Sequence, residues 1–408
     1  MKKNTRVTFI GLGYIGLPTA VVCANKGYKV FGIDIDQNLV DKINTKKIEI
    51  VEPGLKDQLE KVVDNENFKA YTDIQTADVY LVVVPTPFKG DYQPDLKHVK
   101  AAIQSLILFL KKEDLVIIES TCPVGTTEQM MNFIYEERPE LKDQLYLAYC
   151  PERVLPGNVL HELALNDRVI GGINEESTIR ASEFYRHFVD GELHQTNART
   201  AEMCKLTENA SRDAQIAFAN ELSIICDKAK INIYELIELA NKHPRVNLLQ
   251  PGTGVGGHCI AVDPYFIASA FPKESVMIKT SRTINNNKTQ WCLGKIIDEV
   301  RLFETENGHK PSVALMGLAF KPDIDDLRES PALIIVKELH TMNLLGQFFV
   351  VEPNIKHSDE FELVDFKTAN EEADIIVFLV AHYQFKKLPN LPNKRILDFC
   401  GVKKQGWE

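Results

Sequence analysis

A glycine-rich turn near the N-terminus is the feature that most constrains the fold. The apolar run Val7–Ile10 predicts a buried strand, and a helix is expected from Ile15 to Lys26. Between them Gly11, Gly13 and Gly16 form the pattern G-x-G-x-x-G, which allows a tight turn and a close approach of the backbone to a pyrophosphate. The order strand, glycine turn, helix predicts a dinucleotide-binding α/β domain, with a chance glycine-rich turn as the weaker alternative.

The cofactor is indicated by Asp34, which follows the next predicted strand, Lys29–Ile33. It lies 34 − 11 = 23 residues after the first glycine, where such domains carry an acid that binds the ribose 2′-hydroxyl. A carboxylate repels a 2′-phosphate, so the expected cofactor is NAD rather than NADP.

The two ends of the chain repeat one pattern. In the first half Ala77-Asp78 precede the predicted strand Val79–Val84. In the second half Val313–Gly317 predicts a strand that runs into a glycine turn, and Ala373-Asp374 precede the predicted strand Ile375–Val380. The Asp follows the turn glycine by 78 − 11 = 67 residues in one half and by 374 − 317 = 57 in the other. Two related nucleotide-binding domains are expected.

The segment between these halves predicts a long helix. Thr200–Lys230 contains neither Pro nor Gly, and its apolar residues recur at helical spacing. At 1.5 Å per residue it would extend about 45 Å, which suits a spine and a dimer surface. The expected fold class is α/β, with two Rossmann-like doubly wound domains, 1–195 and 301–408, joined by a central helical domain, 196–300, that contains one long helix.

Composition limits the kinds of partner. At 408 residues the chain exceeds the usual size of one core, and a net charge of −10 argues against wrapping nucleic acid or coating an anionic membrane. No run of about 18 apolar residues is present, and glycines interrupt the apolar start Met1–Leu17, which argues against a signal peptide. The eight cysteines are scattered singly, as expected for a reducing compartment and not for a metal site. A cytoplasmic protein without membrane, nucleic-acid or metal partners is expected.

Polar residues at two strand ends and on the long helix are candidate site residues. Thr86 and Thr121 each follow a predicted strand, where ligands of an open parallel sheet lie, although turn chemistry beside Pro explains them nearly as well. Lys205 and Asn209 share one helix face. A Lys can act as acid, base or oxyanion stabiliser and an Asn can hold a hydroxyl, but a solvated helix face is the common explanation of such a pair.

A cysteine follows a second glycine-rich segment. Gly252–Gly257 contains four glycines, which indicates a backbone that folds tightly or lies against a ligand. A thiol directly after such a loop is exposed to the ligand, so Cys259 is a candidate nucleophile, with Asp263 placed to orient water. A buried structural cysteine is the alternative.

The segment Phe320–Pro331 carries many charges. Lys321 and Arg328 are cations of the kind that pair with phosphates or carboxylates. Since acids outnumber bases in this segment, a solvated charged loop is the alternative.

In this order the motifs resemble those of the UDP-glucose/GDP-mannose dehydrogenase family over essentially the whole chain. The stretches that carry the resemblance are Tyr149–Gly157, Arg199–Asn209, His243–Asn247, Gly256–Asp263 and Phe320–Pro331.

The resemblance implies an NAD-dependent homodimer that oxidises the primary alcohol of a UDP-sugar to a carboxylate in two hydride transfers. It implies that Cys259 adds to the aldehyde, giving a thiohemiacetal and then a thioester, while Lys205 with Asn209 serves as acid/base and oxyanion stabiliser. The groups implied for the water that releases the acid are Asp263, Glu152 and Thr121. The product is expected to supply surface-polysaccharide synthesis.

Binding residues are carried over position by position from the resemblance. The implied cofactor contacts are Gly11, Gly13, Tyr14, Ile15, Gly16, Asp34, Thr86, Thr121 and Arg328. The implied substrate contacts are Arg153, Val154, Lys205, Asn209, Arg212, His243, Arg245, Gly256 and Lys321.

The chain departs from the UDP-glucose branch near the sugar. It has Val262 where that branch usually has Lys, and Arg153 and Pro156 where that branch has an apolar pair and a second Glu. These departures favour an N-acetylated hexosamine, with N-acetylmannosamine ahead of N-acetylglucosamine on resemblance alone. A two-electron β-hydroxyacid dehydrogenase and a catalytically silent nucleotide-sugar sensor are the alternatives. The cysteine and the third domain argue against the first, and Cys259 with Lys205 against the second.

Overall fold

The computed structural model describes residues 5–50, 52–90, 92–154, 157–342, 344–388 and 394–403, so Pro156 lies outside the described residues. The chain divides into two compact units. The first comprises Met1–Glu208 with Tyr265–Ala270, and the second Asn209–Pro264 with Phe271–Glu408. The α/β fold class predicted from the sequence is confirmed, whereas the three-domain division at residues 195 and 300 stays a prediction. No helix of the described residues is both long and apolar enough to cross a membrane.

The first unit is built on an eight-stranded sheet in the order β10-β9-β8-β7-β4-β1-β2-β3. Its strands are β1 (Arg6–Ile10), β2 (Lys29–Ile33), β3 (Phe68–Tyr71), β4 (Val79–Val82), β7 (Leu115–Ile118), β8 (Tyr146–Tyr149), β9 (Arg168–Gly172) and β10 (Leu193–Asn197). Neighbouring strands are parallel except β8 and β9, which are antiparallel. The run β3-β2-β1-β4-β7-β8 is the strand order of a Rossmann fold, whose ligands bind where the order reverses beside β1 and β4.

Both faces of this sheet are buried, as a parallel sheet requires. Along β4, Val79 and Leu81 join one apolar core, and Tyr80 and Val82 join the other. The helices of this unit are α1 (Gly16–Asn25), α2 (Gln37–Asn44), α3 (Leu55–Asp64), α4 (Lys97–Leu106), α5 (Thr126–Glu137), α6 (Val159–Leu165) and α7 (Glu175–Tyr185). Short elements are the 3₁₀ turns Ile107–Phe109 and Pro139–Leu141 and the hairpin of β5 (Phe88–Lys89) and β6 (Gln93–Pro94).

The second unit contains a four-stranded parallel sheet in the order β12-β11-β13-β14. Its strands are β11 (Ser312–Met316), β12 (Gln347–Val351), β13 (Ile375–Phe378) and β14 (Arg395–Asp398), and its helices are α12 (Pro331–Met342), α13 (Phe366–Glu372) and α14 (Tyr383–Lys386). The glycine turns of the two sheets match. Gly11 has φ +98° and Gly317 has φ +101°, and each donates its N–H at 2.8 Å to the last residue of the neighbouring strand. The predicted relation between the two halves therefore extends to their turn geometry.

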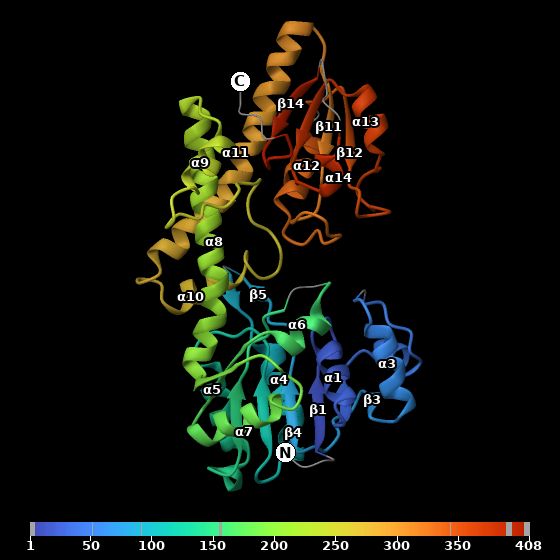
Figure 1. Ribbon diagram of the computed structural model, residues 1–408, viewed down its shortest axis with the longest axis vertical. Coiled ribbons are helices and arrows are strands. Elements are labelled where there is room, and N and C mark those ends of the chain that lie inside the picture. The colour runs from blue at the N-terminus through green and yellow to red at the C-terminus, as the bar shows by residue number, and fades with distance from the viewer. Residues whose placement is uncertain are drawn as a thin grey trace. The chain divides into compact units, whose positions relative to one another are not determined.

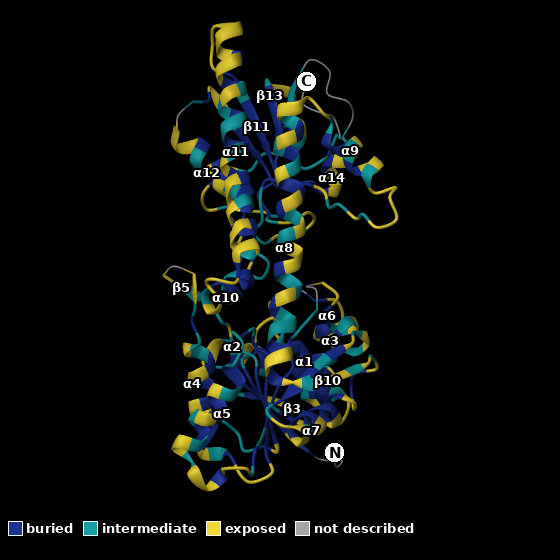
Figure 2. Cartoon of the chain, turned by 90° about the vertical axis from the view of Figure 1, so that its left-hand side faces the viewer, coloured by how far each residue is buried: buried dark blue, intermediate teal, exposed yellow. Residues whose placement is uncertain are grey.

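The helical part contains α8 (Ala198–Ala229), α9 (Ile233–Ala240), α10 (Asp263–Ala270) and α11 (Val276–Asn307). Figure 1 shows α8 as one unbroken helix, within two residues of its predicted bounds. Figure 2 shows buried and exposed residues alternating along α8, whereas the inner strands β1, β4, β11 and β13 are mostly buried.

The second long helix, α11, was not predicted, because the run Asn285–Asn287 and Gly294 weaken the helical signal in the sequence. The structure explains the polar run by burial against α8. Asn285 is fully buried, bonds Asp213 at 2.7 Å and accepts the amide of Asn220 at 2.9 Å. The polar side chain of Asn285 is therefore hydrogen-bonded between the two helices.

Candidate active site

The glycine turn after β1 fits a dinucleotide. A Cβ at Gly11 would lie 2.3 Å from the carbonyl oxygen of Val83, and one at Gly16 would lie 1.9 Å from the carbonyl oxygen of Gly11, so both positions require glycine. At Gly13 a Cβ would meet nothing within 4 Å, which leaves the backbone open to a ligand. The turn leads into α1 through Ile15, while Tyr14 is 43% exposed beside it. The predicted cofactor residues Gly11, Gly13, Tyr14, Ile15 and Gly16 thus lie in one turn between β1 and α1, as in dinucleotide-binding domains, and their contact with the cofactor stays a prediction.

Asp34 is held against this turn. Its Oδ2 accepts the N–H of Leu12 at 2.9 Å, and its Oδ1 accepts the N–H of Asp36 at 3.1 Å. The next side chain, Ile35, is 95% exposed, although exposure of so large an apolar group is costly. Ile35 follows the predicted ribose-binding acid directly, and the sequence motif did not single it out.

Two strand ends meet beside the turn. Thr86 follows β4 and Thr121 follows β7, and both are half-buried. Ser120 ties the two ends together, because its Oγ accepts the N–H of Val84 at 2.9 Å and lies 2.7 Å from the carbonyl oxygen of that residue. The predicted threonines therefore stand at adjacent carboxyl ends of the sheet, as ligand-binding residues of such a sheet do.

The first turn of α8 is anchored to the start of α5. The buried carboxylate of Glu202 accepts the N–H of Gly125 at 2.6 Å and both the N–H and the hydroxyl of Thr127, at 2.7 and 2.6 Å. Burial raises the pKa of Glu202, whereas these hydrogen bonds lower it. Glu202 caps α5 from a distant part of the chain, and no local motif indicates it.

Glu152 lies just after β8 and is oriented by a buried cation. Arg168 places Nη2 at 3.4 Å from Oε2 of Glu152 and Nη1 at 3.8 Å from Oε1 of Glu119. The hydroxyl of Tyr185 donates to Glu119 at 2.5 Å. Burial raises the pKa of Glu119 against the opposing charge of Arg168. The predicted water activator thus has a buried electrostatic support that the sequence analysis missed.

Lys205 and Arg153 lie on this same side of the first unit. Lys205 Nζ donates to the backbone carbonyl of Glu152 at 2.8 Å. Arg153 forms a two-point ion pair with Glu208 of α8, with N–O distances of 2.8 and 3.2 Å, and donates to the carbonyl of Asp167. The structure therefore brings these three predicted residues together and adds Glu208 as the group that fixes the guanidinium.

The cysteine loop of the second unit packs against the segment Phe320–Pro331. A Cβ at Gly256 would lie 2.3 Å from the carbonyl oxygen of Glu329, and one at Gly257 would lie 2.7 Å from the ring of Phe320. Gly257 donates its N–H to the carbonyl of Arg328 at 3.0 Å. The two motifs that the sequence placed 60 residues apart are therefore one structure, held by close backbone contact.

Cys259 lies two residues after the glycine loop. It is half-buried and is followed after one turn by α10, where Asp263 donates its N–H to the carbonyl of Cys259 at 2.8 Å. Burial raises the pKa of every other thiol, namely those of Cys23, Cys122, Cys150, Cys204, Cys226, Cys292 and Cys400. A raised pKa disfavours the thiolate, so these seven are poor nucleophiles.

Asn209 and Asp263 are joined directly. The amide Nδ2 of Asn209 donates to Oδ2 of Asp263 at 2.5 Å, and Asp263 is only 3% exposed. The hydrogen bond fixes the carboxylate that follows the cysteine loop to the long helix. Both residues were predicted, but the bond between them was not.

The remaining predicted residues are mostly exposed. Arg328 is paired with Asp326, with N–O distances of 2.6 to 3.1 Å. The Asp326 carboxylate raises the pKa of Arg328, and Cys259 adds to the shift, so the guanidinium and the sulfur interact. Val154 packs against the first core. The exposed predicted substrate contacts are Arg212, His243, Arg245 and Lys321.

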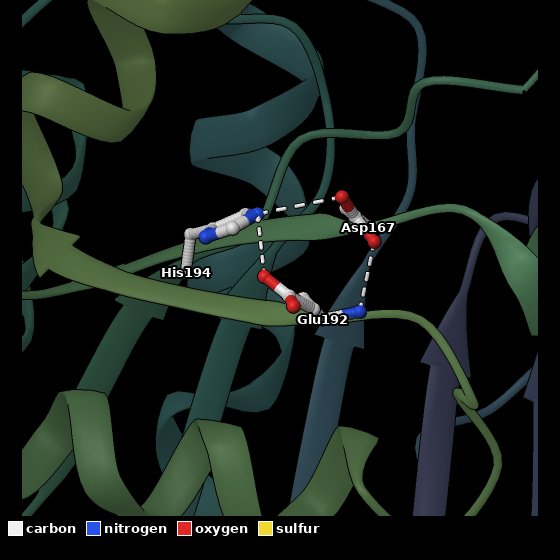
Figure 3. A group of neighbouring side chains, drawn as sticks. All are labelled: Asp167, Glu192 and His194. Carbon is white, nitrogen blue, oxygen red and sulfur yellow. Dashed lines mark hydrogen bonds and ion pairs between the residues drawn. The ribbon is translucent and has the colours of Figure 1, made fainter.

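One group of possible metal ligands occurs among the described residues. Figure 3 shows Nε2 of His194 facing the carboxylates of Asp167 and Glu192, at 3.5 and 3.9 Å. All three side chains are exposed, and the N–H of Glu192 already occupies Oδ1 of Asp167 at 2.8 Å. Ion pairing on the surface accounts for this group, and we assign it no role.

Family models match nearly the whole chain. The NAD binding domain of the UDP-glucose/GDP-mannose dehydrogenase family matches residues 5–189, its central domain 199–287, and its UDP binding domain 314–405. The chain belongs to this family. It is an NAD-dependent UDP-sugar dehydrogenase, in agreement with the glycine turn after β1.

Individual relatives are similar over their full length. The chain is 50% identical to the UDP-N-acetyl-D-mannosamine dehydrogenase of Campylobacter jejuni, over 98% of this chain and 100% of that protein. It is 47% identical to the NDP-N-acetyl-D-galactosaminuronic acid dehydrogenase of Ralstonia nicotianae, over 97% of this chain and 96% of that protein. The structure of a UDP-D-ManNAc dehydrogenase from Pyrococcus horikoshii matches with a TM-score of 0.87 at 36% identity, covering 97% of this chain and 96% of that one.

Proposed function

We propose that the protein oxidises UDP-N-acetyl-D-mannosamine to UDP-N-acetyl-D-mannosaminuronate, with Cys259 as its nucleophile. The observation that carries the proposal is the setting of Cys259. It is a half-buried thiol at the end of a glycine loop packed on the segment of Lys321 and Arg328.

The chemistry requires a nucleophile because one alcohol must lose two hydrides. Sγ of Cys259 adds to the aldehyde carbon formed in the first oxidation, which gives a thiohemiacetal with a hydrogen on the same carbon. Loss of that hydrogen as hydride gives a thioester, and water then releases the carboxylate and restores the thiol. The balance is one alcohol, two NAD⁺ and one water to one carboxylate, two NADH and three protons.

Residues of the chain supply the proton transfers. We assign Lys205 to accept the proton of the alcohol and to stabilise the oxyanion of the thiohemiacetal. Asn209 holds the substrate hydroxyl, and its bond to Asp263 keeps that carboxylate oriented toward the water. Glu152, supported by Arg168, and Thr121 at the end of β7 complete the groups assigned to water.

The first unit holds the cofactor in this proposal. Bound NAD accepts the hydride of each oxidation. Gly11, Gly13 and Gly16 provide the pyrophosphate cradle, Asp34 binds the ribose, and Ile35 covers the adenine. Thr86 and Arg328 are the further contacts that the family resemblance implies.

The choice of sugar rests on the relatives and on Val262 and Arg153, which depart from the UDP-glucose branch. The named relatives include both a mannosamine enzyme at 50% identity and a galactosaminuronic acid enzyme at 47%. We therefore keep UDP-N-acetylglucosamine and UDP-glucose as alternative substrates, and propose surface-polysaccharide synthesis as the use of the uronate. The eight cysteines, all in the described part of the chain, are thiols, which supports the cytoplasm as the proposed compartment.

The deciding experiment is a substrate panel scored by NADH. UDP-N-acetylmannosamine, UDP-N-acetylglucosamine, UDP-N-acetylgalactosamine, UDP-glucose and GDP-mannose are each incubated with NAD. Two NADH per molecule of UDP-N-acetylmannosamine, with the highest kcat/KM of the panel, are expected. One NADH with a ketone product would instead indicate a two-electron β-hydroxyacid dehydrogenase, and binding without turnover would indicate a sensor.

We also propose a homodimer formed through α8. Phe218 and Ile225 are 52% and 53% exposed and lie seven residues apart, hence on one face, with the half-buried Leu222 between them. Large apolar side chains on one helix face indicate a contact surface. The occupant is the same helix of a second copy, because a two-fold axis places identical patches against each other.

A further inference from the structure

The second glycine turn is braced by a carboxylate, as the first one is. Glu352, just after β12, accepts the N–H of Leu318 at 2.7 Å and that of Ala319 at 3.1 Å. Asp34 accepts the N–H of Leu12 in the corresponding position of the first sheet. The two carboxylates differ in access, because the side chain of Glu352 is fully buried.

His382 covers Glu352. The imidazole is fully buried and places Nε2 at 3.0 Å from Oε2 of Glu352. Burial alone would raise the pKa of Glu352, but the hydrogen bonds from His382 and from the backbone outweigh burial and hold the pKa below its ordinary value. The Glu352 carboxylate is therefore a buried anion that is hydrogen-bonded within the protein and does not contact a ligand.

The other ring nitrogen fixes the tautomer of His382. The backbone N–H of Asp323, which can only donate, points to Nδ1 at 2.9 Å, and Nδ2 of Asn354 lies at 2.9 Å from the same atom. Nδ1 is thus the acceptor, and Nε2 carries the hydrogen and donates it in the hydrogen bond to Glu352. The edge of the Phe385 ring and Oδ1 of Asp323, at 3.8 Å from Nδ1, complete the surroundings.

The buried pair of Glu352 and His382 holds both ends of the turn that carries Lys321. Glu352 holds the N–H of Ala319 at the start of the turn, and His382 holds that of Asp323 at its end. Asp323 has a left-handed φ of +63°, an uncommon conformation for this residue, and its Oδ1 accepts the N–H of Tyr383 at 2.8 Å. The exposed Lys321 therefore lies between Ala319 and Asp323, whose N–H groups are held by the buried Glu352 and His382.

We propose that His382 is a positioning residue for the nucleotide of the substrate, acting through the turn Ala319–Asp323 without touching the ligand. The inference rests on the proposed function, in which Lys321 contacts the UDP-sugar. Nδ1 of His382 fixes the end of the turn, so the ammonium of Lys321 is presented in one arrangement to the diphosphate. A turn released from Nδ1 would sample other arrangements. The affinity for the nucleotide would then fall in proportion to the fraction of molecules that keep the binding-competent arrangement.

Two substitutions of His382 distinguish the role of Nδ1 from that of Nε2. In His382→Asn the side-chain oxygen takes the place of Nδ1 and keeps the acceptor for Asp323. In His382→Gln the amide nitrogen takes the place of Nε2 and keeps only the donor toward Glu352. The proposal expects His382→Asn to bind UDP within about threefold of the wild type, and His382→Gln to bind it at least about tenfold more weakly.

The readouts are the Kd of UDP and of NAD by calorimetry, and the KM and kcat for the UDP-sugar. The expected effect of His382→Gln is a raised KM with kcat nearly unchanged and the Kd of NAD unaltered. Equal losses in both variants, or a loss of NAD binding, would assign the imidazole to general packing and overturn the proposal.

Substitutions of the exposed Asp323 test the same turn without changing the buried His382, whose variants could fold poorly. Asp323→Ala removes the bond to Tyr383 and is expected to weaken UDP binding without changing NAD binding, whereas Asp323→Asn keeps an acceptor and should match the wild type. Wild-type UDP affinity in Asp323→Ala would also contradict the proposal. A wild-type protein that binds no UDP would instead refute the proposed function, so the two failures are distinguishable.

Discussion

Nδ2 of Asn209 lies 2.5 Å from Oδ2 of Asp263, so the long helix and the end of the cysteine loop share one hydrogen bond. The orientation of a buried carboxylate depends on the donors that hold it, and Asn209 is one of them. This bond is the most direct physical link between the helix motif and the cysteine motif.

Asn209→Ala and Asp263→Asn are therefore expected to be coupled. Each alone should lower kcat/KM for the UDP-sugar, and the double variant should lose less than the product of the two losses, with a coupling of about 1 to 2 kcal/mol. Initial NADH rates of the four proteins measure it. Independent effects of the two substitutions would show that the bond has no part in catalysis.

Cys259→Ser should stop the overall oxidation and leave binding intact. Serine is a poorer nucleophile without an adjacent base, so kcat for NADH formation is expected to fall by about three orders of magnitude or more. The Kd values of NAD and UDP should stay within a few-fold of the wild type. Cys400→Ser is the matched control, because it changes a half-buried thiol of the C-terminal sheet. Full turnover by Cys259→Ser would refute the thioester route.

Asp34→Asn tests the cofactor assignment. The amide still accepts the N–H of Leu12 but no longer repels a 2′-phosphate, so the KM of NAD should rise about tenfold while NADP becomes a measurable cofactor. Asp36→Asn changes an acid two residues away and keeps its N-cap of α2, so it should leave cofactor preference unaltered. An unchanged ratio of NAD to NADP activity in Asp34→Asn would contradict the role of the carboxylate.

Asp114 predicts a pH dependence of stability. Burial and the nearby Asp78 raise its pKa to about 7, although the N–H of Lys111 opposes the shift. Between about pH 4 and pH 7 the folded state keeps a proton that the unfolded state releases, so the wild type loses stability as the pH rises through this window.

Asp114→Asn removes that titration and can still accept the N–H of Lys111. The variant should match the wild type near pH 4 and be more stable above pH 7, by at most about 4 kcal/mol. Thermal midpoints at pH 5 and pH 8 measure the difference. Parallel shifts of both proteins with pH would show that Asp114 is ionised in the folded state.

Phe218→Arg combined with Ile225→Arg tests the proposed dimer. Two buried cations facing their symmetry copies would repel, so the variant should elute as a monomer in light-scattering chromatography. Leu108→Arg, which changes an 82% exposed leucine of the first unit, is the control and should not alter the mass. A wild-type monomer would refute the dimer itself.

Local sequence signals predicted the local structure well. The spacing of Gly11, Gly13 and Gly16 predicted the turn between β1 and α1, and the lack of Pro and Gly predicted α8 within two residues. The role of Cys259, inferred from the glycines before it, stays a prediction.

The missed residues act through contacts between distant parts of the chain. Glu202 caps a helix that begins 76 residues earlier, at Thr126, and Arg168 reaches back to Glu152 and Glu119. No periodicity encodes such contacts, because they exist only once the sheet has formed. The burial of Asn285 in α11 likewise depends on a contact with α8.

The carboxylates of Asp34 and Glu352 occupy corresponding places after their strands but differ in their access to solvent. One stays partly open beside its turn, and the other is sealed by an imidazole. For protein engineering this makes the two turns non-interchangeable. A dinucleotide fingerprint grafted onto the second sheet would still lack a free carboxylate for a ribose, because His382 already bonds Glu352, and a redesign would have to replace His382 first.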